Sequence, residues 1–468
     1  MHRACGQKQA PLLLLLAASV LIISSSVAAA ELRQVLVKGE EECTNLVLAF
    51  DGLPAYEVHD LTGPARLELV MLNTKLASGA TLPKASYPLL AVNSFQGRDN
   101  LSIAVRLPGV YPYEITAQAN SLVVSFPLTF SASEVIPVLT GVDLNVLRES
   151  SGAAYYECYY TSLPPDVIAS RMRLVVAANY GARTLPLSEM AAREDAVLAM
   201  NAGYFDGAGT PVSLVVHDGL LAALPVKPTR ASLIVDQQGN AFIARSRLEV
   251  WLVADGRRVR VDGFNKAPRD GTVIAYSRLF PKSKLRADSI YYRFSPEGIA
   301  PVGYEQVSQE AFADYILALQ LPPEADPFKY SRSVTFHWRL LGEAGEEIPV
   351  RLAVDGAPVL VENGLVNITT QLDEVPANIA DSVRARTAVG LDCSGNLIWF
   401  VAREDDDNAV PGLSLREVAE RMLRLGAVTA LNLDGGGSSE MALHGVPLNL
   451  ALEKERKLPV ALVLCAAE

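Results

Sequence analysis

Short runs in which apolar and polar residues alternate fill the first part of the chain, from about residue 35 to residue 130. Polar or proline-containing breaks separate these runs, and the clearest of them cover residues 46–50, 65–70, 102–107 and 121–126. Successive side chains of a strand point to opposite faces, so each run predicts a strand with one buried face. Several such strands joined by turns are typical of a small all-β sandwich, which we expect for residues 31–130.

The pattern is less regular between residues 131 and 154. Ser131, Ser133, Pro137 and Gly141 interrupt a moderately apolar stretch. Because serine, proline and glycine are common between domains, this composition predicts a linker and places a domain boundary here. The remaining residues, 155–468, are numerous enough for a second domain with a sizeable core of its own.

Buried strands and a few helices alternate in this second domain. The segments that read as strands are residues 155–160, 173–177, 196–200, 384–392, 397–401 and 428–433, and residues 187–193 read as a short helix. Ser414 and Glu417 form a capping box at the start of a second helix, which Gly426 ends. We therefore predict an α+β fold for residues 155–468, with a strand-rich mixed sheet and a few packed helices.

The strand at residues 428–433 stops at a carboxylate followed by three glycines and two serines, Asp434 to Ser439. Glycine has no Cβ, so consecutive N–H groups of such a loop can turn toward an anionic oxygen, while serine hydroxyls add donors. The alternative is a tight turn with a solvated aspartate. Three consecutive glycines cost more backbone entropy than a turn requires, so we favour a ligand-binding loop.

The strand at residues 196–200 ends in a similar way, at Asn201-Ala202-Gly203-Tyr204-Phe205-Asp206-Gly207. Here too an apolar strand stops abruptly at polar residues, glycine and a carboxylate. We take this stretch as a second candidate site loop. A strand followed by an ordinary glycine turn is the alternative.

The charge balance narrows the classes of partner. The 468 residues include 52 acidic and 41 basic ones, for a net charge of -11, and no long basic run is present. Proteins that bind nucleic acid concentrate positive charge on one face, so we expect no nucleic-acid partner.

The N-terminus has the three parts of a secretory signal peptide, predicted for residues 1–30. His2, Arg3 and Lys8 are basic, residues 12–23 are apolar, and Ala28-Ala29-Ala30 offers a small-residue cleavage site. We expect export to the periplasm or cell envelope, or to the outside of the cell, with no transmembrane segment in the mature chain. An uncleaved anchor is the alternative, although the apolar run is short for a membrane span.

Four cysteines remain after this segment: Cys43, Cys158, Cys393 and Cys465. They are widely scattered, and their spacing fits neither a metal site nor a disulfide framework. One or two bridges in an oxidising compartment and buried free thiols both remain open.

Four blocks of the second domain stand in a characteristic order. They are Met200–Phe205, Asn265 with Arg269 before a strand, Arg386–Gly390, and Gly426-Ala427 followed by Leu431–Ser439; Asn449 and Arg456 add single positions. In these blocks the domain resembles the phosphodiester glycosidase family, and the last block is the most specific. The resemblance implies an exported hydrolase that splits a sugar-1-phosphodiester of a cell-envelope or extracellular glycan into free sugar and a phosphomonoester.

The implied reaction needs positive charge or N–H donors at the phosphate and carboxylates near the sugar carbon. We hypothesise that Arg386, assisted by Arg456 or Arg403, holds the phosphate, since a guanidinium can bind it through two donors. Asp434 is the first candidate for the acid/base or nucleophilic carboxylate, and Asp206 is the second. The other predicted substrate-binding residues are Asn201, which would orient the sugar, and Gly203, Thr387, Asn432, Gly435, Gly436, Gly437 and Ser438. No cofactor is certain, and a Ca²⁺ or Mg²⁺ ion held by the same carboxylates is an open alternative.

Three departures from the family pattern bear on substrate specificity. Arg403 and the acidic run 404–407 replace an aspartate-glycine-arginine turn, Asp355-Gly356-Ala357-Pro358 replaces a glycine-glycine-proline stretch, and Glu440 replaces a threonine. The alternative function is a non-catalytic envelope protein that binds peptidoglycan or a glycosyl-phosphate polymer.

Five segments of the first domain also follow a family order: residues 48–51, 56–58 and 66–69, the strand that contains Arg106, and residues 122–126. In these segments the domain resembles the AMIN domain, a cell-envelope targeting module. The resemblance implies peptidoglycan binding through residues 31–130. A packing or spacer domain is the alternative.

Overall fold

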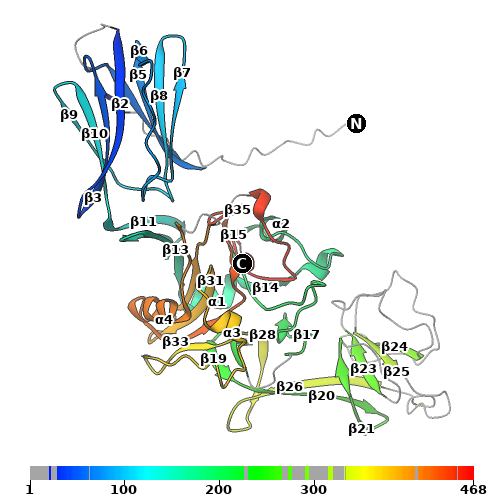
Figure 1. Ribbon diagram of the computed structural model, residues 1–468. Helices are drawn as coiled ribbons and strands as arrows, with labels where there is room; N and C mark the ends of the chain where they lie inside the picture. Colours follow the sequence, from blue (N-terminus) through cyan, green and yellow to red (C-terminus); the bar gives the residue numbers. More distant parts are fainter. Residues whose placement is uncertain are drawn as a thin grey trace, which may run out of the picture. The chain divides into compact units, whose positions relative to one another are not determined.

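The computed structural model describes residues 20–22, 29–62, 64–225, 230–265, 272–276, 290–294, 315–319, 331, 334–405, 409–450 and 452–467. The chain divides into two compact units (Figure 1). The first unit comprises Met1–Ser131 and Arg148–Tyr155, and the second comprises Ala132–Leu147 and Tyr156–Glu468. The described chain is rich in strands, which form several sheets, and has few helices, as predicted at that level.

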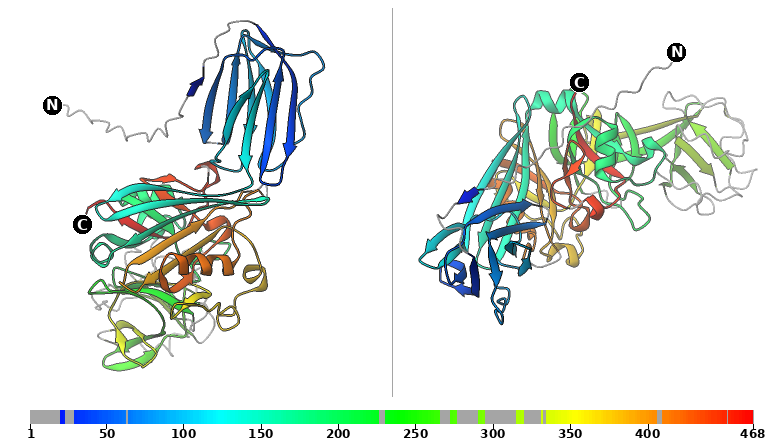
Figure 2. Two further views of the ribbon diagram at one scale, coloured as in Figure 1. Left: turned by 90° about the vertical axis from the view of Figure 1, so that its left-hand side faces the viewer. Right: turned by 90° about the horizontal axis from the view of Figure 1, so that it is seen from above.

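Two five-stranded sheets make up the first unit, in the orders β1-β4-β5-β8-β7 and β6-β2-β3-β10-β9 (Figure 2). Their strands are β1 Val20–Ile22, β2 Ala30–Gly39, β3 Cys43–Phe50, β4 Tyr56–Thr62, β5 Ala65–Leu72, β6 Thr74–Leu76, β7 Ala91–Gln96, β8 Asn100–Arg106, β9 Glu114–Gln118 and β10 Ser121–Pro127. The four predicted strands are confirmed within β3, β5, β8 and β10. In β10, Leu122, Val124 and Phe126 are buried and the residues between them are partly exposed, as the alternation predicts.

Most of the predicted signal peptide lies outside the described residues. Of this segment, Val20–Ile22 forms β1, which pairs antiparallel with β4, and Ala30 is the first residue of β2. Among the residues that the structure describes, no helix has both the length and the apolar character needed to cross a membrane.

Residues 131–154, predicted to be a linker, instead belong almost entirely to the long strands β11 (Thr129–Leu139) and β12 (Val142–Ser151). Gly141 lies in the turn between them with φ of 76°, a conformation that glycine adopts readily. Val142 and Leu144 are fully buried in the core of the second unit. The prediction of a linker was wrong, because the moderately apolar stretch is a strand pattern that packs on residues distant in the sequence. The predicted boundary is consistent with the division into units, which changes at Ser131/Ala132, Leu147/Arg148 and Tyr155/Tyr156.

The largest sheet has eight strands in the order β11-β12-β13-β32-β31-β33-β29-β30. Its remaining strands are β13 Ala154–Leu163, β29 Val359–Glu362, β30 Leu365–Val366, β31 Arg386–Asp392, β32 Leu397–Ala402 and β33 Ala427–Asn432. Helix α4 (Leu415–Arg424) packs against β29, β30, β31 and β33 (Figures 1 and 2). The predicted capping box is confirmed: the Glu417 N–H donates to Ser414 Oγ, and the Ser414 N–H donates to the Glu417 carboxylate at 2.7 Å.

Two five-stranded sheets share a core with the eight-stranded sheet. Their orders are β14-β36-β15-β34-β35 and β17-β16-β28-β18-β19. The strands are β14 Met172–Val176, β15 Ala196–Asn201, β16 Val215–His217, β17 Leu220–Ala223, β18 Ala231–Asp236, β19 Ala241–Arg245, β28 Val350–Asp355, β34 Met441–Leu443, β35 Val446–Pro447 and β36 Val460–Cys465. Leu198, Leu233 and Trp399 come from these three sheets and are all fully buried in this core. The strands β15 and β33, which lead into the two candidate loops, therefore belong to different sheets on one core.

The described residues also form two four-stranded sheets, three further short α-helices, and short 3-10 turns that include Gly436–Ser438 in the glycine loop. The sheets, β21-β20-β26-β27 and β22-β23-β25-β24, contain β20 Arg247–Ala254, β21 Arg257–Arg260, β22 Gly263–Phe264, β23 Val273–Tyr276, β24 Ile290–Phe294, β25 Tyr315–Leu319, β26 Val334–Leu341 and β27 Glu347–Ile348. The helices are α1 Pro165–Arg171, α2 Leu187–Arg193 and α3 Ala377–Ala380, of which α2 was predicted. Arg269 of the second block lies outside the described residues.

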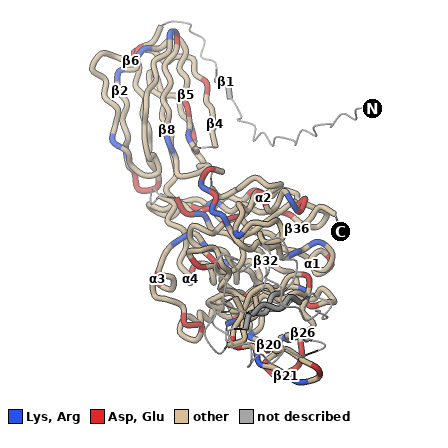
Figure 3. The backbone as a smooth tube through the Cα atoms, turned by 90° about the vertical axis from the view of Figure 1, so that its right-hand side faces the viewer, with Lys and Arg blue, Asp and Glu red and all other residues tan. Residues whose placement is uncertain are grey.

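Cys43, Cys158, Cys393 and Cys465 are free thiols in this structure; Cys158 and Cys465 are buried, Cys43 is partly buried and Cys393 is exposed. Basic and acidic residues are interspersed along the described parts of both units (Figure 3). The basic side chains of the site described below are therefore single residues brought together by folding, not members of a basic run.

Candidate active site

Asn201, the last residue of β15, ties three parts of the site together. Its Nδ2 donates to the Asp434 carbonyl at 2.7 Å, and its Oδ1 accepts from the Thr387 hydroxyl at 2.7 Å and from the Glu440 N–H at 3.0 Å. The side chain is only 1% exposed. The geometry thus assigns Asn201 and Thr387 to holding the glycine loop on β15 and β31, and not to direct contact with a sugar.

Replacing Thr387 by Val should lower the free energy of unfolding by about 1 kcal/mol, because the buried hydrogen bond to Asn201 is lost while the shape is kept. Thr161 offers a matched control. It is equally buried in a strand of the same sheet, but its hydroxyl has no hydrogen-bond partner among the described residues. Thr161→Val should therefore be neutral or stabilising in urea unfolding. Equal losses for the two variants would contradict the role of Thr387.

Asn432, the last residue of β33, makes a second junction. Its Nδ2 donates to the Tyr204 hydroxyl at 2.9 Å, to the Ala357 carbonyl at 2.8 Å and to the Leu433 carbonyl at 2.8 Å. The Tyr204 hydroxyl lies 2.7 Å from the Ala357 carbonyl and donates there. The loop after β15, the loop after β33 and the turn after β28 are thereby joined at one point.

The glycines allow this close packing. A Cβ on Gly203 would lie 3.0 Å from the Ser213 side chain, and one on Gly435 would lie 3.2 Å from the Ala385 carbonyl oxygen. Gly436 has φ of 59°, in the left-handed region that favours glycine. A side chain at Gly203 or Gly435 would therefore crowd its neighbours, so both glycines serve the close packing of the loops.

The loop offers fewer N–H donors to an anion than the sequence suggests. The Gly435 N–H donates to the Asp434 carboxylate at 3.1 Å, and the Gly436 N–H donates to the Ala385 carbonyl at 2.8 Å. Gly437 is exposed, and no acceptor in the described part of the chain lies on its N–H. Of the three predicted donors, only Gly437 is available to a ligand.

Asp434 is the half-buried carboxylate at the centre of this loop. Burial raises its pKa to about 6, against the Ser438 hydroxyl, the Arg456 guanidinium and the Gly435 N–H, which favour the ionised form. Arg456 Nη1 donates to Ser438 Oγ at 3.2 Å, and its guanidinium lies 4.8 Å from the Phe205 ring. The structure thus places Asp434, Ser438 and the exposed Arg456 close together.

Arg386 does not have the role predicted for it. It is 2% exposed; its Nε donates to the Leu413 carbonyl at 3.1 Å, and its Nη2 donates to the Ile379 carbonyl at 3.0 Å and to Ser382. Burial also lowers the pKa of its guanidinium. Arg386 is therefore a structural arginine that holds α3 and the loop before α4 on β31.

Arg403 is committed to ion pairs as well. Its Nη1 lies 3.4 Å from the Glu157 carboxylate, and its Nη2 lies 3.1 Å from the Asp405 carboxylate. Two carboxylates oppose its charge, so the geometry does not support Arg403 as a phosphate ligand.

The side chain of Asp206 forms hydrogen bonds within its own loop. Its Oδ1 accepts from the N–H groups of Ala208 and Thr210, both at 2.9 Å, and the residue is exposed. This is the side-chain turn that aspartate commonly forms with the backbone a few residues on. The structure gives Asp206 a conformational role, which does not support it as the second catalytic carboxylate.

The structure adds a different carboxylate, Asp355, at the end of β28. It is 1% exposed, and no group of the described residues meets its oxygens with full hydrogen-bond geometry, although the Ser213 hydroxyl and the Leu214 N–H lie near enough to favour the ionised form. Burial raises its pKa to about 7, although the Ser213 hydroxyl and the Arg230 guanidinium act in the opposite direction. The sequence signal was present, because Asp355 also ends an apolar strand before a glycine. No sequence signal marked Ser213 or Arg230.

Glu440, one of the departures, is buried directly after the loop. Burial and the neighbouring Glu455 carboxylate raise its pKa to about 9, so Glu440 is protonated at neutral pH. Glu455 accepts from the N–H and the hydroxyl of Ser188, at 2.9 and 2.7 Å, at the start of α2. Because Glu455 precedes Arg456, these contacts fix the segment that carries Arg456.

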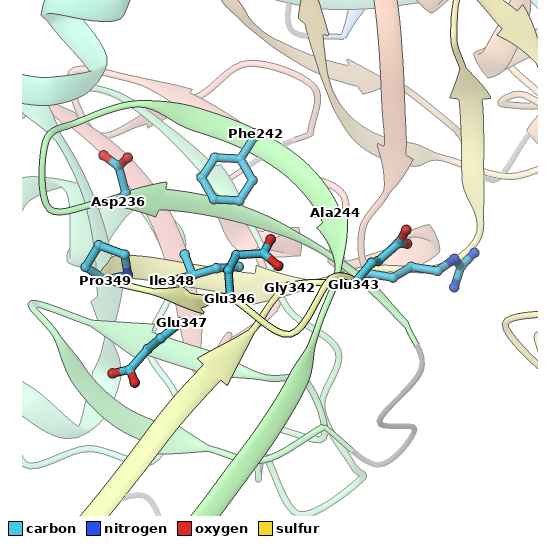
Figure 4. Close-up of a pocket in the computed structure, with 10 residues that line it drawn as sticks. Asp236, Phe242, Ala244, Gly342, Glu343, Glu346, Glu347, Ile348 and Pro349 are labelled. Carbon is cyan, nitrogen blue, oxygen red and sulfur yellow. The ribbon is translucent and has the colours of Figure 1, made fainter.

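The site residues do not form a metal cluster. Within the described ranges, no group of three or more His, Cys, Asp or Glu side chains is arranged to hold a metal ion. A separate cavity of about 460 Å³ is lined by Asp236, Phe242, Arg245, Glu346 and neighbouring residues (Figure 4). Arg245 pairs there with Asp373, and Asp236 binds Asn240, so these side chains are already partnered. None of the site residues described above lines that cavity.

Asp355, Asp434 and Arg456 all fall within one stretch of recognisable family sequence. Residues 295–465 match the family model of the phosphodiester glycosidases. The chain is 35% identical over 108 residues to the human N-acetylglucosamine-1-phosphodiester alpha-N-acetylglucosaminidase, covering 21% of each protein, and 37% identical over 101 residues to the mouse protein. The chain thus matches about a fifth of the length of these curated relatives.

Two solved structures are similar in fold. A hypothetical protein from Synechocystis aligns with a TM-score of 0.62 and 18% identity, over 93% of this chain and 80% of that one. A putative exported protein from Burkholderia pseudomallei aligns with a TM-score of 0.53 and 16% identity, over 92% of this chain and 99% of that one. At these identities the likeness is one of fold alone.

Proposed function

We propose that this chain is a phosphodiester glycosidase that hydrolyses sugar-1-phosphodiesters. The observation that carries the proposal is Asp434, a half-buried carboxylate with a pKa near 6, on a glycine loop beside Arg456. The match of residues 295–465 to the family supports it further. In the curated relatives, the name specifies N-acetylglucosamine as the sugar.

The reaction adds water across the bond between the sugar C1 and the phosphate oxygen. The C1–O bond breaks and its electron pair leaves with the phosphate oxygen, while the oxygen of a water molecule bonds to C1. The proton that this water loses passes to a carboxylate of the site or to the solvent. A phosphomonoester is a good leaving group, so the site must balance its charge more than protonate its oxygen. Arg456 and the Gly437 N–H are the groups placed for this at the loop.

Asp434 acts at C1 as general base or nucleophile. Both roles require the ionised carboxylate, and a pKa near 6 leaves it ionised at neutral pH while keeping it basic enough to accept a proton. The hydrogen bonds of Asn201 with Thr387 and with the Asp434 carbonyl hold one part of the loop, and the hydrogen bond between Asn432 and Tyr204 holds the residues just before it. These contacts hold the carboxylate in one position, which a preorganised site requires.

The full chain should release N-acetylglucosamine and methyl phosphate from N-acetylglucosamine 1-(methyl phosphate). Paired assays with and without a metal chelator would decide whether a Ca²⁺ or Mg²⁺ ion takes part. Methyl phosphate and N-acetylglucosamine 1-phosphate serve as controls for phosphomonoesterase activity. Failure to split any of a panel of sugar-1-phosphodiesters would count against the proposal and favour a protein that binds glycosyl phosphates without cleaving them.

The wider setting that we propose is the cell envelope. The signal-peptide pattern of residues 1–30 supports export to the periplasm, and the AMIN-like order of residues 31–130 supports binding to peptidoglycan. Sedimentation of the full chain with purified peptidoglycan tests this part by itself. A protein that stays in the supernatant would leave the first unit as a spacer.

A further inference from the structure

The guanidinium of Arg230 lies at the candidate site, and its N–H donors have no acceptor among the described residues. It directly precedes β18 and is partly buried. Its Nε is fully buried without a partner, and among the described residues no acceptor lies within hydrogen-bond distance of its guanidinium. A guanidinium that has lost water and gained no acceptor costs stability, so its presence points to an acceptor that arrives with a ligand.

The surroundings of Arg230 connect it to Asp434. Its guanidinium carbon lies 5.5 Å from the centre of the Tyr204 ring. The Tyr204 hydroxyl in turn lies 3.0 Å from the carbonyl oxygen of Leu433, the residue before Asp434. The Gly356 N–H donates to the Ala231 carbonyl at 3.0 Å, which joins the start of β18 to the turn after Asp355. A single side chain therefore separates Arg230 from the loop that carries the carboxylate.

Asp355 is the carboxylate that acts on Arg230, but it makes no hydrogen bond to it. The two charges attract each other without direct contact, so Asp355 can orient the guanidinium and still leave its donors available. Arg386 and Arg403 differ in this respect, because carbonyl groups already accept from Nε and Nη2 of Arg386, and carboxylates lie on Nη1 and Nη2 of Arg403. Arg230, Arg456 and the exposed Arg384, whose Nη1 would lie 4.0 Å from a Cβ on Gly436, are thus arginines of the site with donors to offer a ligand. Of these three, Arg230 alone has a buried Nε without a partner.

We propose that Arg230 binds the phosphate of the substrate, supported by the Tyr204 ring, and that Asp355 is a positioning residue for it. A phosphate presents several acceptor oxygens that match the planar fork of a guanidinium. That the anion is a substrate phosphate rests on the proposed function. The observation that the donors of Arg230 lack an acceptor does not depend on that function.

Binding of methyl phosphate to the full chain, measured by titration calorimetry at pH 6, tests this inference without any turnover. Arg230→Gln should weaken binding at least about tenfold, because charge-assisted hydrogen bonds are lost. Arg193 is the matched control, since its guanidinium also lies over a tyrosine ring, 5.0 Å from that of Tyr180, but donates to Glu189. Arg193→Gln should change binding less than twofold and should keep the thermal unfolding temperature of the wild type. Arg230→Gln should keep or raise that temperature, because it removes a guanidinium whose buried Nε has no partner.

The outcomes separate this inference from the proposed function. Equal binding by wild type and Arg230→Gln, or no binding by the wild type, would overturn the role of Arg230. Binding that depends on Arg230 together with no hydrolysis of sugar-1-phosphodiesters would keep the anion site and reject the glycosidase. Where hydrolysis occurs, Arg230→Lys should raise KM more than it lowers kcat, because a lysine keeps the charge but not the planar fork.

Discussion

Replacing Asp434 by Asn should lower the turnover number for a sugar-1-phosphodiester at least about 1000-fold, because the amide can neither accept a proton nor attack C1. The substitution keeps the shape of the side chain and a carbonyl oxygen for the Gly435 N–H. The fold should therefore remain, and circular dichroism should match the wild type. Initial rates of N-acetylglucosamine release provide the measurement.

The pH dependence of the wild type supplies a second readout for Asp434. Because the ionised carboxylate is the active form, kcat/KM should rise as pH increases through about 6, the pKa to which burial raises this group. Asp206→Asn is the control, since asparagine keeps the Oδ1 that accepts from Ala208 and Thr210. That variant should retain most of its activity. A similar loss in both variants, or an unchanged rate in Asp434→Asn, would remove Asp434 from the mechanism.

Replacing Asp355 by Asn should increase the free energy of unfolding at pH 8 by on the order of 3 kcal/mol. Burial raises the pKa of Asp355 from an ordinary value of 3.8 to about 7 in the folded protein. A carboxyl group whose folded pKa is raised stabilises the fold only in its protonated form. Its contribution is complete below about pH 4, is lost as pH rises from there to 7, and stays lost at higher pH.

The gain from Asp355→Asn should accordingly be small at pH 4, grow up to pH 7 and remain constant above it. Urea unfolding of variant and wild type at a series of pH values measures this difference in the free energy of unfolding. The pH dependence contributed by the other titrating groups cancels in the difference. Asp373 offers a contrasting control, because it is equally buried but accepts from Arg245 at 2.5 Å. Asp373→Asn should destabilise the protein at pH 8. A loss of stability in Asp355→Asn at pH 8 would show that Asp355 is paired more strongly than the structure indicates.

The stability and the phosphate binding of Asp355→Asn together test whether this carboxylate is retained for function. A buried charge without a hydrogen-bond partner lowers stability, and natural proteins retain such groups mainly at functional sites. Asp355→Asn should also weaken methyl phosphate binding several-fold at pH 8, where the wild-type carboxylate is ionised, through the loss of orientation of Arg230. A variant that is more stable but binds phosphate less well would fit a positioning residue and would not fit a purely structural one.

Much of the local structure could be predicted because it depends on neighbouring residues. The alternation of residues 121–126 placed β10, and the Ser414 and Glu417 capping box placed the start of α4. The same reasoning failed at residues 131–154, where serine, proline and glycine suggested a linker. There the buried face of β12 and partly buried residues of β11 pack in a core built from residues distant in the sequence, which a local pattern does not reveal.

The sequence by itself determined that an apolar strand ends at Asp434 and continues into three glycines, and that a second strand ends at Asn201. Only the tertiary structure decided which arginines can meet a ligand. Arg386 lies in the strand block that the sequence singled out, yet carbonyl groups already accept hydrogen bonds from its Nε and Nη2. Arg230, beside Tyr204, has a buried Nε without an acceptor. The reason is physical: residue type decides which hydrogen bonds a side chain can make, but the packing of β15, β18, β28 and β33 on one core decides which of them are already made.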